Sequence, residues 1–101
     1  PGRRTARMSD EGTPTAVIAD DERLMRSQIA ARLKEAWPEL AIVGEAANGR
    51  EAVALVRSLA PDIVFLDIRM PGMTGVDAAR QIAQLPADDD WRGCEIVFIT
   101  E

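Results

Sequence analysis

The chain has 101 residues, of which 47% are apolar and 29% are charged, so it can build one small domain around a hydrophobic core. Its formal net charge of -5 argues against a basic face that would let this segment itself bind nucleic acid. Histidine is absent, which excludes histidine-based catalysis and histidine metal sites here. The single cysteine, Cys94, cannot form an internal disulfide or a thiolate zinc site, so we expect a reducing, cytoplasmic setting.

Residues 1–14 are polar and contain two glycines and two prolines, a composition typical of disordered chain. We expect this leader to be partly vector-derived, with Met8 as the natural start. Residues 15–101 then form a single domain. No apolar run is long enough to cross a membrane.

After the leader, short apolar runs alternate with segments whose apolar residues recur at helical spacing. The runs predict strands that are buried on both faces, at residues 15–19, 40–46, 63–66 and 95–100. The intervening segments predict helices at residues 23–37, 48–59 and 74–83. The order βαβαβαβ predicts an α/β doubly wound architecture: a parallel sheet with right-handed crossovers and helices on both faces.

Two of the predicted helices begin with capping patterns. Asn48 is followed three residues later by Glu51, and Thr74 is followed in the same way by Asp77. In each pair the first side chain can accept a hydrogen bond from the backbone of the first turn.

Acidic residues stand where two of the predicted strands reach their carboxyl ends. Asp20 and Asp21 follow the first strand, and Asp67 follows the third. The carboxyl ends of parallel strands open into one crevice, where ligands bind. Three carboxylates gathered there would repel one another and favour a hard divalent cation such as Mg2+.

A simpler interpretation stays open for each of these acids. Asp20, Asp21 and Glu22 could cap the first helix, and Asp67 could be a solvated residue at a strand end. Burying Asp67 after four apolar residues nevertheless costs free energy unless something compensates its charge.

The remaining polar features lie in loops and at the last strand. Pro71 and Gly72 predict a rigid turn beside the third strand, with a positive φ available to Gly72. Thr100 ends the fourth strand with a hydroxyl that we expect at the same crevice. The acidic run at residues 88–90 lacks the further ligands of a calcium loop, and we interpret it as solvated. Trp91, in the same loop, could be a hydrophobic anchor or a contact site.

In combination these residues resemble the receiver domain of two-component response regulators, from about Thr15 to Thr100. The resemblance is carried by the strand-end pair Asp20-Asp21, by the stretch LDIRMPGMTG at residues 66–75, by the turn ANGREA at residues 47–52 and by Thr100. It implies a flavodoxin-like sheet with the strand order 2-1-3-4.

The resemblance also implies a role for each site residue. Asp67 would accept a phosphoryl group from the phosphohistidine of a sensor histidine kinase. Asp21 would ligate Mg2+ together with Asp67 and the backbone carbonyl of Arg69, and Asp20 would act through a metal-bound water. Thr100 would hydrogen-bond the phosphoryl group and change orientation when Asp67 is modified. The output would be DNA-binding transcription regulation through a domain outside this chain, with a weak similarity to regulators of the LytTR type.

The chain departs from the receiver pattern at its end. A receiver domain has a further α-β-α segment, whose strand ends in a lysine that pairs with the phosphoryl group, and this chain stops at Glu101. Lys34, the only lysine, lies in the first helix and cannot substitute. We therefore expect an incomplete sheet with its fourth strand as an exposed edge, and self-association into a dimer or larger homo-oligomer.

Two other functions stay open. One is a Mg2+-dependent phosphohydrolase with Asp67 as nucleophile, although Arg69 stands where the haloacid-dehalogenase class has a second aspartate. The other is a degenerate receiver that serves only protein–protein interaction. The prediction is a signalling domain rather than an enzyme, limited at most to its own phosphorylation and dephosphorylation.

Overall fold

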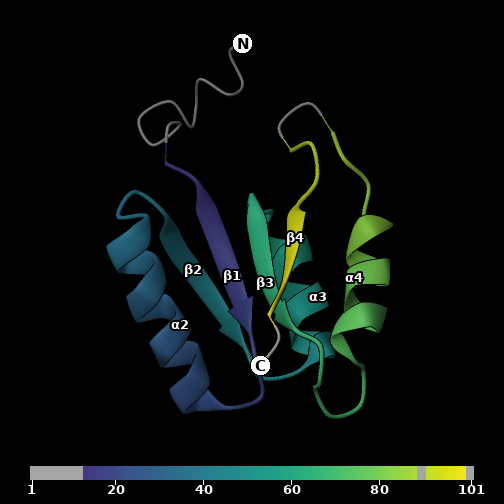
Figure 1. Ribbon diagram of the computed structural model, residues 1–101. Coiled ribbons are helices and arrows are strands. Elements are labelled where there is room, and N and C mark those ends of the chain that lie inside the picture. Colours follow the sequence, from purple (N-terminus) through teal and green to yellow (C-terminus); the bar gives the residue numbers. More distant parts are fainter. Residues whose placement is uncertain (1–12, 89–90, 100–101) are drawn as a thin grey trace.

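The computed structural model describes residues 13–88 and 91–99. The predicted switch residue Thr100, the terminal Glu101, most of the predicted leader and two residues of the acidic loop lie outside this part of the chain. Within it, four strands and three helices alternate (Figure 1): β1 (Thr15–Ala19), α2 (Arg23–Ala36), β2 (Ala41–Ala46), α3 (Gly49–Leu59), β3 (Ile63–Asp67), α4 (Gly75–Ala83) and β4 (Glu95–Ile99).

The four strands form one parallel sheet in the order β2-β1-β3-β4. The sequence predicted the strand order 2-1-3-4 and an α/β flavodoxin-like fold, and the structure confirms both. The elements also agree closely with the predicted ranges, although β2 begins one residue later than expected and β3 continues through Asp67. Asp67 is therefore the last residue of a paired strand, opposite Ile99 of β4.

Helices cover both faces of the sheet, as the alternation predicts. One face packs against α3 and α4, and the core on that side consists of small and branched apolar side chains. Its strand members are Val17, Ala19, Ala46, Val64 and Leu66, and its helix members are Ala52, Val53, Val56, Ala78 and Ile82. Alternate residues of β1, such as the fully buried Ile18, lie outside that core, and α2 contacts the same strand from the opposite face.

The two predicted capping patterns are present. Asn48 Oδ1 accepts a hydrogen bond from Glu51 N at 2.8 Å, and Glu51 Oε1 accepts one from Ala47 N at 2.8 Å. Thr74 Oγ1 accepts one from Asp77 N at 3.2 Å. The bonds donated by Glu51 N and Asp77 N satisfy backbone donors in the first turns of α3 and α4, and the bond from Ala47 N holds the residue before the N-cap of α3.

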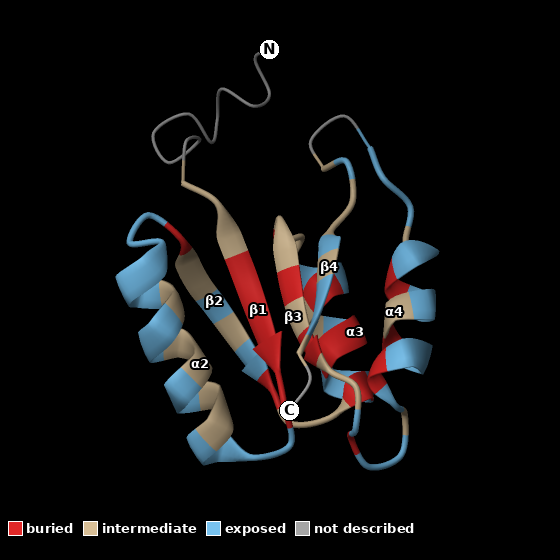
Figure 2. Cartoon of the chain, in the orientation of Figure 1, coloured by how far each residue is buried: buried red, intermediate tan, exposed pale blue. Residues whose placement is uncertain are grey.

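The packing of α2 differs from that of the other two helices. Figure 2 shows buried residues in α3 and α4, whereas none of the 14 residues of α2 is buried. Its inward side chains, Met25, Ile29 and Leu33, are only half-buried. Within the described residues, α2 is therefore packed less tightly on the sheet than α3 and α4 are.

The loop before β4 is anchored by Trp91, which decides the alternative that the sequence left open. The indole Nε1 donates to the carbonyl oxygen of Pro61 at 2.8 Å, and the ring packs against the core on the α3–α4 side. The backbone N of Trp91 donates to Asp88 Oδ1 at 2.9 Å, so Asp88 shapes this loop.

Cys94 is half-buried, as expected for a packing thiol. Burial is the main reason that the pKa of its thiol is raised to about 12, and the nearby charges of Asp62 and Glu95 act in the same direction. The group therefore stays protonated at neutral pH and is a poor nucleophile. No helix in the described part of the chain has the length and apolar character to cross a bilayer.

Candidate functional site

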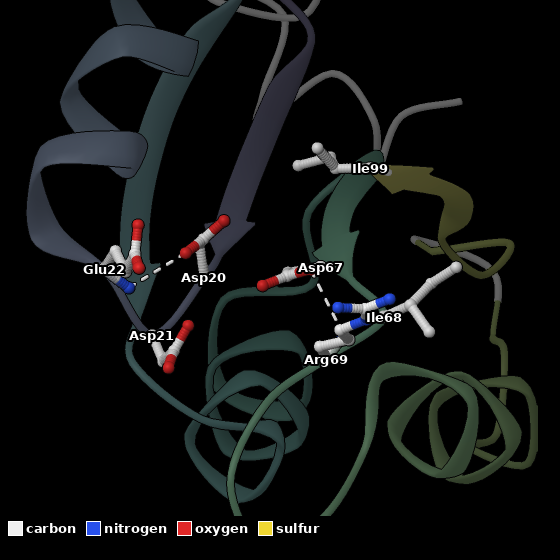
Figure 3. A pocket seen from close by; sticks show the side chains of 7 residues that line it. All are labelled: Asp20, Asp21, Glu22, Asp67, Ile68, Arg69 and Ile99. Carbon is white, nitrogen blue, oxygen red and sulfur yellow. Dashed lines mark hydrogen bonds between the residues drawn. The ribbon is translucent and has the colours of Figure 1, made fainter. Parts of the chain in front are cut away.

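The carboxyl ends of β1 and β3 open into an acidic pocket. We use this name for the cavity of about 480 Å³ that is lined by Asp20, Asp21, Glu22, Asp67, Ile68, Arg69 and Ile99. In Figure 3 the side chains of Asp20 and Asp67 point toward each other across the pocket, and Asp21 lies beside them. Because β1 and β3 are neighbours in the sheet, the ends of these two parallel strands coincide.

The structure brings together the three predicted aspartates. One carboxylate oxygen each from Asp20, Asp21 and Asp67 lies within 4.8 Å of the others. The three groups differ in environment: Asp20 is buried, Asp67 is half-buried and Asp21 is exposed. Carboxylate oxygens are the ligands that a hard divalent cation prefers, and Mg2+ takes one or two of them directly while it keeps several waters.

Asp20 is held rigidly at the end of β1. Its N donates to the carbonyl oxygen of Ala46 at 3.0 Å, which continues the pairing with β2. Its Oδ1 accepts from Glu22 N at 2.8 Å, and its own carbonyl oxygen accepts from Arg26 Nη1 at 2.7 Å. The N-cap residue of α2 is Glu22, whose side chain makes no capping hydrogen bond. The capping interpretation therefore holds only for Asp20, through its bond from Glu22 N, and that bond is compatible with a metal site.

Burial, first of all, raises the pKa of Asp20 above its ordinary value of 3.8, because only 4% of the residue is exposed. The hydrogen bond from Glu22 N opposes this effect, the charges of Asp67 and Asp21 add to it, and the charge of Arg26 opposes it. The pocket thus holds negative charge that the folded protein stabilises incompletely.

Replacing Asp20 with asparagine should stabilise the metal-free protein near neutral pH. A carboxyl with a raised pKa binds more protons in the folded state than in the unfolded state, so the free energy of unfolding falls as pH rises above 3.8. The amide oxygen in Asp20→Asn can still accept from Glu22 N but carries no charge. Urea unfolding with a chelator present should show a gain for the variant near pH 7 that disappears below the ordinary pKa. A gain that is constant with pH would contradict this cause.

Asp67 is positioned by β3 and by the turn that follows it. Its Oδ1 accepts from Arg69 N at 3.2 Å, and Gly72 adopts the predicted positive φ, of 76°. The side chain of Arg69 is exposed at the pocket rim. Ile99 of β4 also lines the pocket and directly precedes Thr100, which lies outside the described residues.

Two contributors to the site were missed by sequence reasoning. Gly75, the first residue of α4, lies so close to the main chain of Asp67 and Ile68 that a Cβ would overlap it. Arg26 contacts the end of β1 from α2. The second left a signal in the sequence, since an arginine occurs in helical register with the inward-facing Ile29 and Leu33. The first lies in the stretch at residues 66–75 that carries the resemblance, but a glycine after an N-cap has many explanations, so no role could be assigned to it.

Comparison with known proteins agrees with this geometry. The chain is 50% identical over 74 residues to an uncharacterized response regulatory protein of Vibrio cholerae, a match that covers 73% of the chain and 28% of that protein. It is 46% identical over 76 residues to the transcriptional regulatory protein PdtaR of Mycobacterium tuberculosis, covering 74% of the chain and 36% of that protein. The chain thus spans about a third or less of the length of these relatives.

A solved structure of the same fold is the CheX–CheY–BeF3–Mg2+ complex from Borrelia burgdorferi. It aligns with a TM-score of 0.72 at 26% identity and covers 86% of this chain and 61% of that chain. The sequence profile described as "Response regulator receiver domain" matches residues 16–101. Because that match extends from β1 through β4 and includes the three aspartates of the acidic pocket, the chain belongs to the response regulator receiver domains of two-component systems.

Proposed function

We propose that Asp67 is the phosphoacceptor of this receiver domain and that a sensor histidine kinase is the donor. The observation that supports this role is the placement of its carboxylate: it ends β3, is half-buried, and faces Asp20 and Asp21 across an open cavity. Asp20 is less suited to nucleophilic attack, because it is almost fully buried and one of its oxygens is bonded to Glu22 N.

The transfer consists of one substitution at phosphorus. A carboxylate oxygen of Asp67 forms a bond to the phosphorus atom, and the phosphorus–nitrogen bond of the donor phosphohistidine breaks. The electron pair of that bond stays on the imidazole nitrogen, which takes up a proton. The product on this chain is an acyl phosphate, which carries more negative charge than the original carboxylate.

The acidic pocket fits Mg2+ as the cofactor of this reaction. Asp21 and Asp67 would hold it together with the backbone carbonyl of Arg69, and Asp20 would hold one of its waters. When bound, Mg2+ neutralises charge on the transferring phosphoryl group. The fit is supported by the three oxygens within 4.8 Å. Burial, and to a lesser extent the charges of Asp67 and Asp21, raise the pKa of Asp20, so a bound cation would stabilise its ionised form. In the complex from Borrelia burgdorferi, the similar fold is solved with Mg2+.

We further propose that phosphorylation is transmitted through Thr100, the residue that follows Ile99 in the sequence. The hydroxyl would hydrogen-bond a phosphoryl oxygen and shift when Asp67 is modified, which biases the nearby surface between two arrangements. Transcription regulation through a DNA-binding domain outside this chain is the output we propose. The name of the Mycobacterium tuberculosis relative supports the part of this proposal that concerns transcription regulation.

Intact mass spectrometry after incubation with Mg2+ and a small phosphodonor such as acetyl phosphate tests the role of Asp67. We expect a single phosphoryl adduct on the chain and none on Asp67→Asn. The matched control is Asp77→Asn, which removes an exposed carboxylate in the first turn of α4 and should keep the adduct. An adduct that persists in Asp67→Asn would overturn the assignment of the acceptor.

Two further measurements, turnover of a small phosphate ester and Mg2+ binding, separate the other two functions. Steady turnover of a small phosphate ester would favour the phosphohydrolase. Absence of any adduct, together with absence of Mg2+ binding, would favour a degenerate receiver used only for protein–protein interaction.

We also propose that the chain self-associates. Val97 and Phe98 of the edge strand β4 are 42% and 44% exposed, and exposed apolar residues on a strand edge favour association. Light scattering should show a mass above that of a monomer, and a stable monomer across a dilution series would count against this.

A further inference from the structure

Arg26 is not among the residues that line the acidic pocket, yet its side chain joins two of the strands around it. Its Nη1 donates to the carbonyl oxygen of Asp20 at 2.7 Å, at the end of β1. Its Nε donates to Glu45 Oε1 at 3.0 Å, on β2. The side chain is 14% exposed, whereas that of Glu45 is 43% exposed, so the guanidinium is shielded from solvent more than its partner.

The contact with Asp20 completes the fixation of that residue. Its N is bonded to β2, its Oδ1 to Glu22 and its carbonyl oxygen to Arg26. The first bond holds the peptide group that precedes Asp20, and the second holds its carboxylate. The third ties the peptide group that follows Asp20 to α2. The direction in which the carboxylate enters the pocket therefore depends on Arg26.

This bridge matters because α2 begins directly after the acidic residues that line the pocket. The helix buries none of its residues, and its first turn follows directly from Asp21 and Glu22. A rigid guanidinium that donates to two strands at once limits both the sliding and the tilting of the helix. Motion of α2 would otherwise move Asp20 and Asp21 relative to Asp67.

We propose that Arg26 is a positioning residue, which holds Asp20 and Asp21 at the spacing that Mg2+ requires. The proposal rests on the proposed function insofar as Mg2+ is the ligand of the pocket. Groups that hydrogen-bond to metal ligands, without touching the metal, orient those ligands. They therefore contribute to metal affinity in addition to the ligands. This role is distinct from that of a nearby positive charge, and the two roles predict opposite effects of removing it.

Mg2+ titration of the full chain by calorimetry distinguishes these roles. If Arg26 positions the ligands, Arg26→Gln should weaken Mg2+ binding by about tenfold. If Arg26 acts only as a charge, its removal should strengthen binding, because a cation near the site repels Mg2+. Arg26→Lys keeps the charge but lacks the fork that reaches both acceptors, so it should also weaken binding. The control is Arg80→Gln, which removes an exposed arginine from α4 and should leave the affinity unchanged.

Amide hydrogen exchange without metal gives an independent measurement. The amide of Glu22, which donates to Asp20 Oδ1, should exchange about fivefold faster in Arg26→Gln, while the amides of α3 should be unaffected. Unchanged Glu22 exchange, or Mg2+ binding that is equal or tighter, would overturn the proposal. If Arg26→Gln does not fold, Arg26→Lys decides, and failure of both to fold would make Arg26 a folding residue instead. If the wild-type chain binds no Mg2+, the proposed function fails, but the exchange experiment still tests the positioning.

Discussion

Replacing Gly75 with alanine is expected to destabilise the protein by about 3 kcal/mol or more and to disturb the acidic pocket. A Cβ at this position would overlap the carbonyl oxygen of Asp67 and lie 2.8 Å from the Cα of Ile68. These are backbone atoms of the segment that carries Asp67 and cannot rotate away as a flexible side chain could. Gly75 N also donates to the carbonyl oxygen of Ile68 at 2.9 Å, so displacing α4 would break this bond.

Urea unfolding measures this effect, and Gly72→Ala is the matched control. Gly72 has a φ of 76°, and a Cβ there would meet nothing within 4 Å, so alanine should cost only the backbone strain of about 1 kcal/mol. Equal losses at the two positions would show that the close approach of α4 to β3 is unimportant. We also expect that any folded fraction of Gly75→Ala accepts a phosphoryl group poorly. The overlap of the new Cβ with the main chain can be removed only by moving the backbone of Asp67 or the start of α4.

Trp91→Ala is expected to cost about 3 kcal/mol of unfolding free energy. The substitution removes a ring that packs against the core and leaves the carbonyl oxygen of Pro61 without its indole donor. Trp91→Phe keeps most of the packing and loses only the hydrogen bond, so it should cost about 1 kcal/mol.

Trp37 provides the matched comparison for Trp91. It lies at the C-terminal end of α2 and is 37% exposed, and Trp37→Ala should cost no more than about 1 kcal/mol. Urea unfolding of the three variants gives the comparison. A loss at Trp37 as large as that at Trp91 would mean that the α2 face of the sheet contributes as much stability as the α3–α4 face.

The fold was predictable because its information is local. Short apolar runs form strands, helical spacing forms helices, and Asn48 and Thr74 cap helices through neighbours three residues away. The regular alternation of strand and helix then leaves few parallel topologies, and the observed order is the expected one. The position of the three aspartates follows from the same logic, since each lies at the carboxyl end of a strand.

The sequence by itself determined the α/β architecture, the beginnings of two helices and the gathering of Asp20, Asp21 and Asp67 at one edge of the sheet. Only the tertiary structure decided which groups hold that edge in place. Arg26 meets Glu45 across 19 residues, and Trp91 meets Pro61 across 30. Contacts of this kind depend on how helices and loops are placed against the sheet, to within a fraction of the length of a side chain, and no short-range pattern of residues encodes that placement.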